Sequence, residues 1–248
     1  MFSINPWTVA LAALITAIAT GLGAFPFFFY RNIKPSVLGI SNAIAAGLML
    51  GASAGLIVEG LAYSSLRTVL GVTAGIIFIS ITHSLLSKRE DLNIGEIQGA
   101  DARKAILILG VMTLHLFSEG VGVGVSFGGG EALGQLITAA IAIHNIPEGL
   151  AISLVFIPRG SSVLKAAWWS IFSSLPQPLM AVPAFLFVEL FKPILPAGLG
   201  FAAGAMIWMV FSELIPDSLE NTSKNYVAIS TTLAITAMLV FQNLLNNL

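Results

Sequence analysis

The sequence predicts an all-α integral membrane protein in which a single domain, residues 1–248, carries eight transmembrane helices. Only 9% of the 248 residues are charged and 56% are hydrophobic, whereas soluble domains carry about 25% charged residues. The apolar residues gather in eight runs, each close to the roughly 20 residues that a helix needs to cross a bilayer. The net charge is −1 and the chain has no cysteine, so we expect no nucleic-acid partner, no disulfide and no thiolate metal site.

The eight predicted spans follow one another with mostly short polar connections. Their approximate limits are 6–30, 36–63, 67–87, 104–126, 132–157, 162–189, 195–215 and 225–247. The first run has no basic segment before it, which distinguishes it from a cleaved secretory signal. The long connection between the third and fourth spans, at about 88–103, has no histidine and no strong periodic pattern, so we expect a solvated loop. Pro176, Pro178 and Pro183 predict a strong kink in the sixth span.

The basic residues predict the orientation of the spans, because Lys and Arg accumulate on the cytoplasmic side of a membrane. With eight spans, one side receives nine of the eleven basic residues and the other receives two, Arg67 and Lys192. The side with nine is predicted to be cytoplasmic, which places both termini on the non-cytoplasmic side. The lipid bilayer is then a partner of the whole chain, although no residue specifies which membrane is the host.

Glycines recur at every fourth position within several spans. This spacing lets neighbouring helices approach closely in a solvent where no hydrophobic force drives them together. We therefore expect helix contacts along three sets of glycines, namely Gly47, Gly51 and Gly55, then Gly120 and Gly124, then Gly200 and Gly204.

Two consecutive spans each contain a histidine followed by a glutamate four residues later. His115 and Glu119 lie in the fourth span, and His144 and Glu148 lie in the fifth. Residues four apart face the same side of a helix, and ionisable side chains at this depth are costly and functional by default. The two spans should pack antiparallel, which would bring two imidazoles and two carboxylates to one point. That donor set suits a borderline divalent cation such as zinc.

The residues around these pairs also favour a metal site. Asn145 offers a further oxygen between the two candidate ligands of the fifth span. Pro147 donates no hydrogen bond to the carbonyl of Ile143, so we expect kinks where the fourth and fifth spans form the site. Gly120 and Gly149 each follow a glutamate and would allow a neighbouring helix to approach closely.

Other interpretations of the polar residues remain open. A single intramembrane histidine can serve as an interhelical hydrogen-bonding group, and its repetition on adjacent spans is what favours metal binding. His83, near the end of the third span, is interpreted as a packing or interfacial histidine. Glu59 and Glu213 lie towards the ends of the second and seventh spans. Each is either an entrance or exit ligand or an interfacial charge, and a pathway role is favoured for Glu213.

These motifs resemble those of the ZIP (Zrt/Irt-like) family of metal transporters, in particular its GufA-type branch. HNIPEG at 144–149 resembles the metal motif of the family, and HLFSEG at 115–120 is a looser version of it. GFAAGAMIWMVFSELIPDS at 200–218 is similar to the seventh-span signature of that branch. AAGLMLGAS at 45–53 and ATGLGAFP at 19–26 resemble its second and first spans, so the resemblance covers essentially the whole chain.

The resemblance implies a ZIP-like bundle that carries divalent metal ions towards the cytoplasm. It implies a primary site made of His115, Glu119, His144, Asn145 and Glu148. Met49 matches a second-span methionine that some members of the family place against the same ion.

Two departures from the family's pattern bear on the number of ions. Some members hold a second ion, using a polar residue after the first histidine and a glutamate on the sixth span. Here these positions are Leu116, which cannot ligate, and Gln177, an amide in place of an anion. We therefore expect one ion per protomer, with Gln177 tuning the pathway at most.

The sequence thus predicts a metal transporter that is not an enzyme and has no prosthetic group. Zinc is the favoured cargo, whereas Fe2+, Mn2+ and Cd2+ stay open because ligand type alone does not separate them. One alternative is a metal-dependent intramembrane hydrolase, against which the absence of an HExxH motif argues. Another is a proton-coupled carrier of a different solute. The oligomeric state is open, with a homodimer as one option.

Overall fold

The computed structural model describes residues 4–29, 34–88, 93–95 and 97–246, and these are almost entirely helical. In chain order the elements are α1 (Pro6–Gly21), the 3-10 helix η1 (Leu22–Phe28), α2 (Pro35–Tyr63), α3 (Ser65–Ser87), β1 (Asn93–Ile94), β2 (Ile97–Gln98), α4 (Gly99–Gly128), α5 (Glu131–Phe156), α6 (Val163–Ser174), α7 (Pro176–Leu186), α8 (Val188–Phe191), α9 (Leu195–Met209), the π-helix η2 (Val210–Leu214), α10 (Ile215–Asn221) and α11 (Lys224–Asn246).

Polar residues in the short breaks determine where the helices begin. The side chain of Asn5 accepts a hydrogen bond from the backbone N–H of Trp7 at 3.0 Å, and Pro6 follows at the first helical position. Ser162 caps α6 in the same way, by accepting from the backbone N–H of Lys165. Such caps satisfy donors that would otherwise be exposed at the start of a helix.

Seven helical stretches within the described residues are long and apolar enough to cross a membrane. They are Pro6–Phe28, Pro35–Tyr63, Ser65–Leu85, Asp101–Gly128, Glu131–Phe156, Leu195–Asn221 and Lys224–Leu244. These stretches coincide with seven of the eight spans that the sequence predicts. The prediction of an all-α, multi-pass membrane protein is therefore confirmed, and many outward-facing apolar side chains, such as Trp7, Leu66 and Phe211, fit a surface that faces lipid.

The sixth predicted span, 162–189, is not one continuous helix. It divides into α6, α7 and the short α8, and α6 ends where the backbone N–H of Leu175 donates to the carbonyl of Phe172. The break has a direct cause, because Pro176 has no N–H with which to continue the helical hydrogen bonds. The count of eight crossings therefore stays a prediction that depends on how α6 and α7 together traverse the membrane.

The segment between the third and fourth predicted spans also differs from the sequence prediction. Within 88–103, β1 and β2 form a small antiparallel hairpin, and α4 begins at Gly99 rather than at 104. The early part of α4 is held by Arg159, whose Nε lies 2.6 Å from Asp101 Oδ1. The fourth and fifth spans are each assigned as a single helix, and α5 continues through Pro147.

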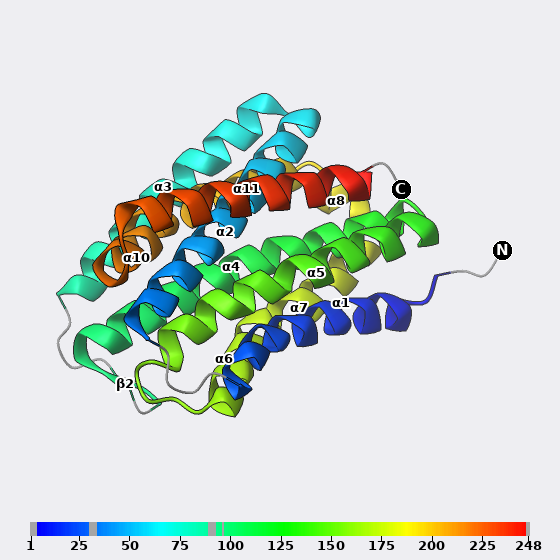
Figure 1. Cartoon of the computed structure of the whole chain (residues 1–248). Helices are drawn as coiled ribbons and strands as arrows, with labels where there is room; N and C mark the ends of the chain where they lie inside the picture. Colours follow the sequence, from blue (N-terminus) through cyan, green and yellow to red (C-terminus); the bar gives the residue numbers. More distant parts are fainter. Residues whose placement is uncertain (1–3, 30–33, 89–92, 96, 247–248) are drawn as a thin grey trace.

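The helices pack in two groups that meet in the middle of the molecule. One group contains α1, α4, α5, α6 and α7, and the other contains α2, α3, α9, α10 and α11. The groups meet where α4 packs on α9 and where α5 packs on α2. In the view of Figure 1, α3 and α11 lie on one side of α4 and α5, while α1 and α7 lie on the other.

The repeated glycines lie where helices touch, as the sequence predicts. A Cβ atom on Gly47 or Gly51 would collide with α11, one on Gly120 or Gly124 with α7, and one on Gly200 or Gly204 with α3. Each set therefore forms one helix contact, and the set on α4 is the one that lies beside the predicted site.

Candidate metal centre

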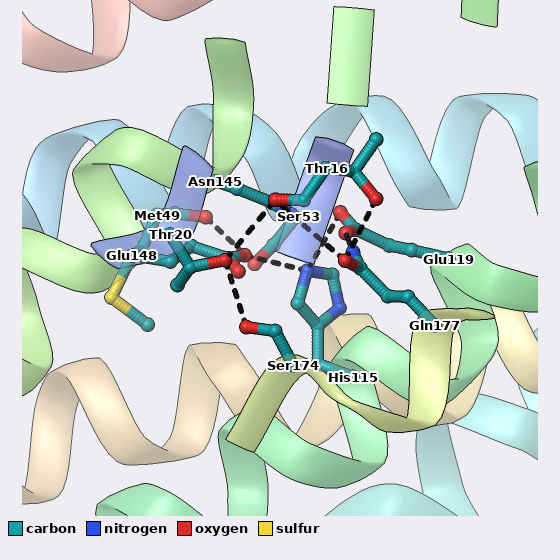
Figure 2. Close-up of polar contacts among 10 residues, drawn as sticks. All are labelled: Thr16, Thr20, Met49, Ser53, His115, Glu119, Asn145, Glu148, Ser174 and Gln177. Carbon is teal, nitrogen blue, oxygen red and sulfur yellow. Dashed lines mark hydrogen bonds and ion pairs between the residues drawn. The ribbon is translucent and has the colours of Figure 1, made fainter. Parts of the chain in front are cut away.

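Four helices of one group bring polar side chains to a single buried point. α4 contributes His115 and Glu119, α5 contributes Asn145 and Glu148, and α7 contributes Gln177 (Figure 2). All five are buried, with Glu119 the most exposed at 6%. Thr16 of α1 contacts this group through Gln177 and Asn145. The cluster is thus enclosed by these four helices.

Two glycines explain how the helices come close enough at this point. A Cβ on Gly120 would lie 2.5 Å from the carbonyl oxygen of Gln177, and a Cβ on Gly149 would overlap the carbonyl oxygen of Thr20. α7 and α1 therefore press directly on the turns that follow Glu119 and Glu148. This confirms the expectation that each glutamate is followed by a glycine because a neighbouring helix approaches there.

The ligand atoms of three residues converge closely. His115 Nε2 lies 3.2 Å from Glu119 Oε1 and 2.6 Å from Glu148 Oε1, and the three ligand atoms all lie within 4.8 Å of one another. Donors about 2.0–2.1 Å from a tetrahedral zinc ion are about 3.3 Å apart. The 3.2 Å separation is close to this value, whereas the 2.6 Å separation between His115 Nε2 and Glu148 Oε1 must lengthen by about 0.7 Å.

The charges of the centre also fit a cation. Burying two ionised carboxylates next to each other is unfavourable unless a positive charge compensates them. In its neutral form the imidazole of His115 would offer a nitrogen lone pair to an ion, and each carboxylate would offer oxygen. A divalent ion at this point would balance both carboxylates at once, so the geometry accommodates it.

A network of amide and hydroxyl groups surrounds the three candidate ligands. Gln177 Nε2 donates to Glu119 Oε2 at 2.6 Å. Gln177 Oε1 lies 2.9 Å from Thr16 Oγ1 and accepts from Asn145 Nδ2 at 3.2 Å. Asn145 Nδ2 also donates to the carbonyl oxygen of Thr16 at 2.9 Å. The dashed lines of Figure 2 trace this chain from α1 through α5 and α7 to Glu119.

Asn145 is left with one oxygen that the network does not use. Its Oδ1 is buried and accepts no hydrogen bond from any residue that the structure describes. Because an unsatisfied buried acceptor is costly, this oxygen fits a role as a ligand, as the sequence predicts for Asn145.

Two other predicted ligands are less closely defined. His144 lies on α5 one turn before Glu148, but its side chain is outside the described part of the structure, so its role as a ligand stays a prediction. Met49 is buried on α2, in the other helix group. In the view of Figure 2 its thioether lies beyond Glu148, on the side away from Gln177.

The two predicted pathway glutamates lie outside the cluster. Glu59 is exposed near the end of α2. Glu213 lies on η2, where His83 Nε2 approaches it at 3.7 Å and Lys104 Nζ at 3.4 Å. His83 also packs against Trp208 and is partly exposed, in line with the interpretation as a packing histidine.

Sequence reasoning missed Thr16, Thr20 and Lys104. Thr16 and Thr20 are fully buried on α1, and Thr20 accepts a hydrogen bond from Ser174. The signal that was available is their spacing of four residues within an apolar span, which places both hydroxyls on one face. Lys104 pairs with Asp217 at 2.5 Å, a contact across 113 positions that no local pattern indicates.

Comparisons with known proteins agree with this geometry. The family model of the ZIP zinc transporters matches residues 82–241. Zinc transporter GufA of Myxococcus xanthus is 32% identical over 221 residues, covering 84% of this chain and 87% of that protein. Zinc transporter ZIPB of Bordetella bronchiseptica is 29% identical over 218 residues, covering 82% and 70%.

A plant relative is more similar but much longer. A candidate zinc transporter of Arabidopsis thaliana is 50% identical over 234 residues, covering 93% of this chain. The chain spans only 38% of that protein's length. On the strength of the family model and the GufA match together, this chain belongs to the ZIP zinc transporter family.

Proposed function

We propose that this chain transports a divalent transition metal ion, with zinc as the favoured cargo, across the membrane towards the cytoplasm. The observation that carries the proposal is the convergence of His115, Glu119 and Glu148 in a buried centre within the membrane-spanning bundle. Membership of a transporter family makes the chain a transporter rather than an enzyme, and it favours neither the hydrolase nor the carrier of another solute.

The proposed site holds one ion between α4 and α5. His115, Glu119 and Glu148 bind it, Asn145 Oδ1 and His144 complete its coordination, and Met49 approaches from α2. Gln177 supports a single ion because its amide nitrogen already occupies Glu119 Oε2, where a second cation would otherwise find an anionic oxygen.

The mixed donor set favours zinc and leaves room for related ions. Imidazole nitrogen and carboxylate oxygen suit zinc and also bind Fe2+, Mn2+ and Cd2+. A carrier must release its cargo, and a site of mixed nitrogen and oxygen donors without thiolates holds these ions less tightly than a structural zinc site. We therefore rank zinc first and expect the other three ions to compete with it.

The proposed route crosses the bilayer in a chain of eight spans with both termini on the non-cytoplasmic side. The division of basic residues, nine on one side and two on the other, supports this orientation. Glu59 and Glu213 lie towards opposite ends of the bundle, near the end of α2 and on η2. They are proposed as residues of the pathway on either side of the centre.

Uptake into liposomes tests the proposal directly. Purified protein is reconstituted with an internal fluorescent zinc indicator, and wild type is compared with Glu148→Ala and His115→Ala. We expect saturable zinc entry that both variants lose, because each removes a ligand. Glu189→Ala is the matched control, since the Glu189 side chain is 89% exposed on α8. Equal filling by wild type and both site variants would contradict the proposal.

A further inference from the structure

Gln177 is the residue that connects the candidate metal centre to the rest of α7. Its side chain is fully buried, and it donates to one oxygen of Glu119 while the other oxygen of Glu119 faces His115. We propose that Gln177 is a positioning residue that restricts Glu119 to binding through one oxygen and thereby favours zinc over ions that require more oxygen ligands. This inference rests on the proposed transport function.

Thr16 fixes the direction in which both amides face. A backbone carbonyl can only accept, so Asn145 must present Nδ2 to the carbonyl oxygen of Thr16, 2.9 Å away. The same Nδ2 lies 3.2 Å from the Gln177 side chain, and an N–H donor there requires the oxygen of Gln177, not its nitrogen. Gln177 Nε2 is therefore directed at Glu119, and reversing the amide would place acceptor against acceptor.

The hydroxyl of Thr16 strengthens the same arrangement. Thr16 Oγ1 lies 2.9 Å from Gln177 Oε1 and 2.7 Å from the carbonyl oxygen of Ala13. Both neighbours are acceptors, so the one hydroxyl hydrogen serves one of them at a time. Gln177 Oε1 thus has two donors available, from Thr16 and Asn145, and the amide does not need to rotate to satisfy its oxygen.

The fixed amide limits how Glu119 can bind an ion. A carboxylate binds through both oxygens only when both lie at about the same distance from the ion. Gln177 holds Oε2 at 2.6 Å on the α7 side, while Oε1 lies 3.2 Å from His115 Nε2. A hydrogen bond to a charged acceptor is short and about twice as strong as a neutral one. Binding of Glu119 Oε2 to the ion would break this hydrogen bond and is therefore energetically unfavourable.

Metal ions differ in how much this restriction matters. Zinc is satisfied by four ligands with one oxygen from each carboxylate. Mn2+ is suited by six oxygen ligands, and a second oxygen from Glu119 is one way to supply them. The Gln177 amide should therefore disfavour Mn2+ more than it disfavours Zn2+.

Substitution of Gln177 separates a positioning role from a structural one. Gln177→Met keeps an unbranched side chain of similar length but removes the donor, so Glu119 is free to use both oxygens. We expect the ratio of zinc to manganese uptake, measured by competition in the same liposomes, to fall by about fivefold, which is within the range that loss of a typical intramolecular hydrogen bond produces. A purely structural role would lower both uptakes together and leave the ratio unchanged.

Matched variants of α1 complete the test. Thr16→Val removes one donor to Gln177 and should lower the ratio less than Gln177→Met does, whereas Thr16→Ser keeps the hydroxyl and should preserve it. Thr20→Val removes a buried hydroxyl one turn away that bonds Ser174 instead, and it should leave the ratio unchanged.

The outcomes for this inference and for the proposed function are distinct. Wild-type liposomes that take up no metal contradict the transport function itself. Wild-type uptake with an unchanged ratio in Gln177→Met overturns the positioning role alone. If Gln177→Met does not fold, Thr16→Val decides: a lower ratio than in Thr16→Ser supports the role, and equal ratios overturn it.

Discussion

At the scale of single residues, the two carboxylates of the centre have different surroundings and should contribute unequally. Glu148 is fully buried and lies 2.6 Å from His115 Nε2, whereas Glu119 shares one oxygen with the amide of Gln177. The negative charge of Glu119 is therefore already partly stabilised by a donor. An arriving cation should gain more from Glu148, and loss of that charge should cost more than loss of the charge on Glu119.

Neutral replacements of the two glutamates test this difference. We expect Glu148→Gln to raise the KM for zinc by more than about tenfold, because even loss of a group that only supports a metal ligand costs about 10–100-fold, and we expect Glu119→Gln to raise it less. Both variants keep the size of the side chain, so the charge is what changes. Initial rates over a series of zinc concentrations provide the measurement, and a larger effect at Glu119 than at Glu148 would show that the order is wrong.

Single residues also show how far the sequence could predict the centre. His115, Glu119 and Glu148 are predictable as candidate ligands because each belongs to a His–Glu pair spaced four residues apart within one helix, the first pair on α4 and the second on α5. The orientation of Gln177 is not, because it depends on Thr16, which lies 161 positions away and meets it only when α1 and α7 pack together. Hydrogen bonds between segments that are distant in the sequence leave no local pattern. The hydrogen-bond network around Gln177 is therefore visible only in the structure.

At the scale of helices, glycine determines where neighbouring elements cross. Gly120 touches α7 at Gln177, and Gly124 touches it at Ala181, so one face of α4 follows α7 past the candidate metal centre. The four-residue spacing of these glycines predicted the contacts, because residues four apart lie on the same face of a helix. The division of the sixth predicted span into α6 and α7 was harder to predict, since the prolines indicate a kink but not its extent.

Two alanine substitutions on α4 test the crossing with α7. Gly120→Ala places a Cβ against the backbone of Gln177 at 2.5–2.6 Å, whereas a Cβ on Gly122 meets nothing within 4 Å. Overpacking costs typically about 1–3 kcal/mol, so we expect Gly120→Ala to lower the thermal unfolding midpoint by several degrees. Gly122→Ala should leave the midpoint unchanged or raise it, because alanine favours helix over glycine by about 1 kcal/mol.

Unfolding in detergent, followed by circular dichroism, provides the comparison. Equal midpoints for the two variants would mean that α4 and α7 separate easily at this point, and the close crossing would then not hold the centre together.

At the scale of the whole molecule, the two helix groups are joined by an ion-pair cluster away from the candidate metal centre. Lys104 of α4 lies 2.5 Å from Asp217 of α10 and 3.4 Å from Glu213 of η2, so the contact links one group to the other. Lys104 lies eleven residues before His115, or about 16 Å along the helix. We expect the candidate centre to open alternately to each side during transport, and movement of the group containing α4 and α5 against the other would change this contact.

A reversible cross-link between the groups tests whether they move against each other. The chain has no cysteine, so Lys104→Cys with Asp217→Cys introduces one reactive pair. A short bis-methanethiosulfonate reagent can bridge the two thiols through disulfide bonds, with sulfinate as the leaving group. We expect bridging to stop zinc uptake and a reductant to restore it, because the link would hold α4 to α10 throughout the cycle.

The matched control is Asp101→Cys with Arg159→Cys, which replaces an ion pair of 2.6 Å within one group. Bridging that pair should leave uptake intact, since both positions move together. Full uptake through a completely bridged 104–217 pair would show that the two groups stay fixed during transport, and the ion would then have to pass through local rearrangement around His115 and Glu148.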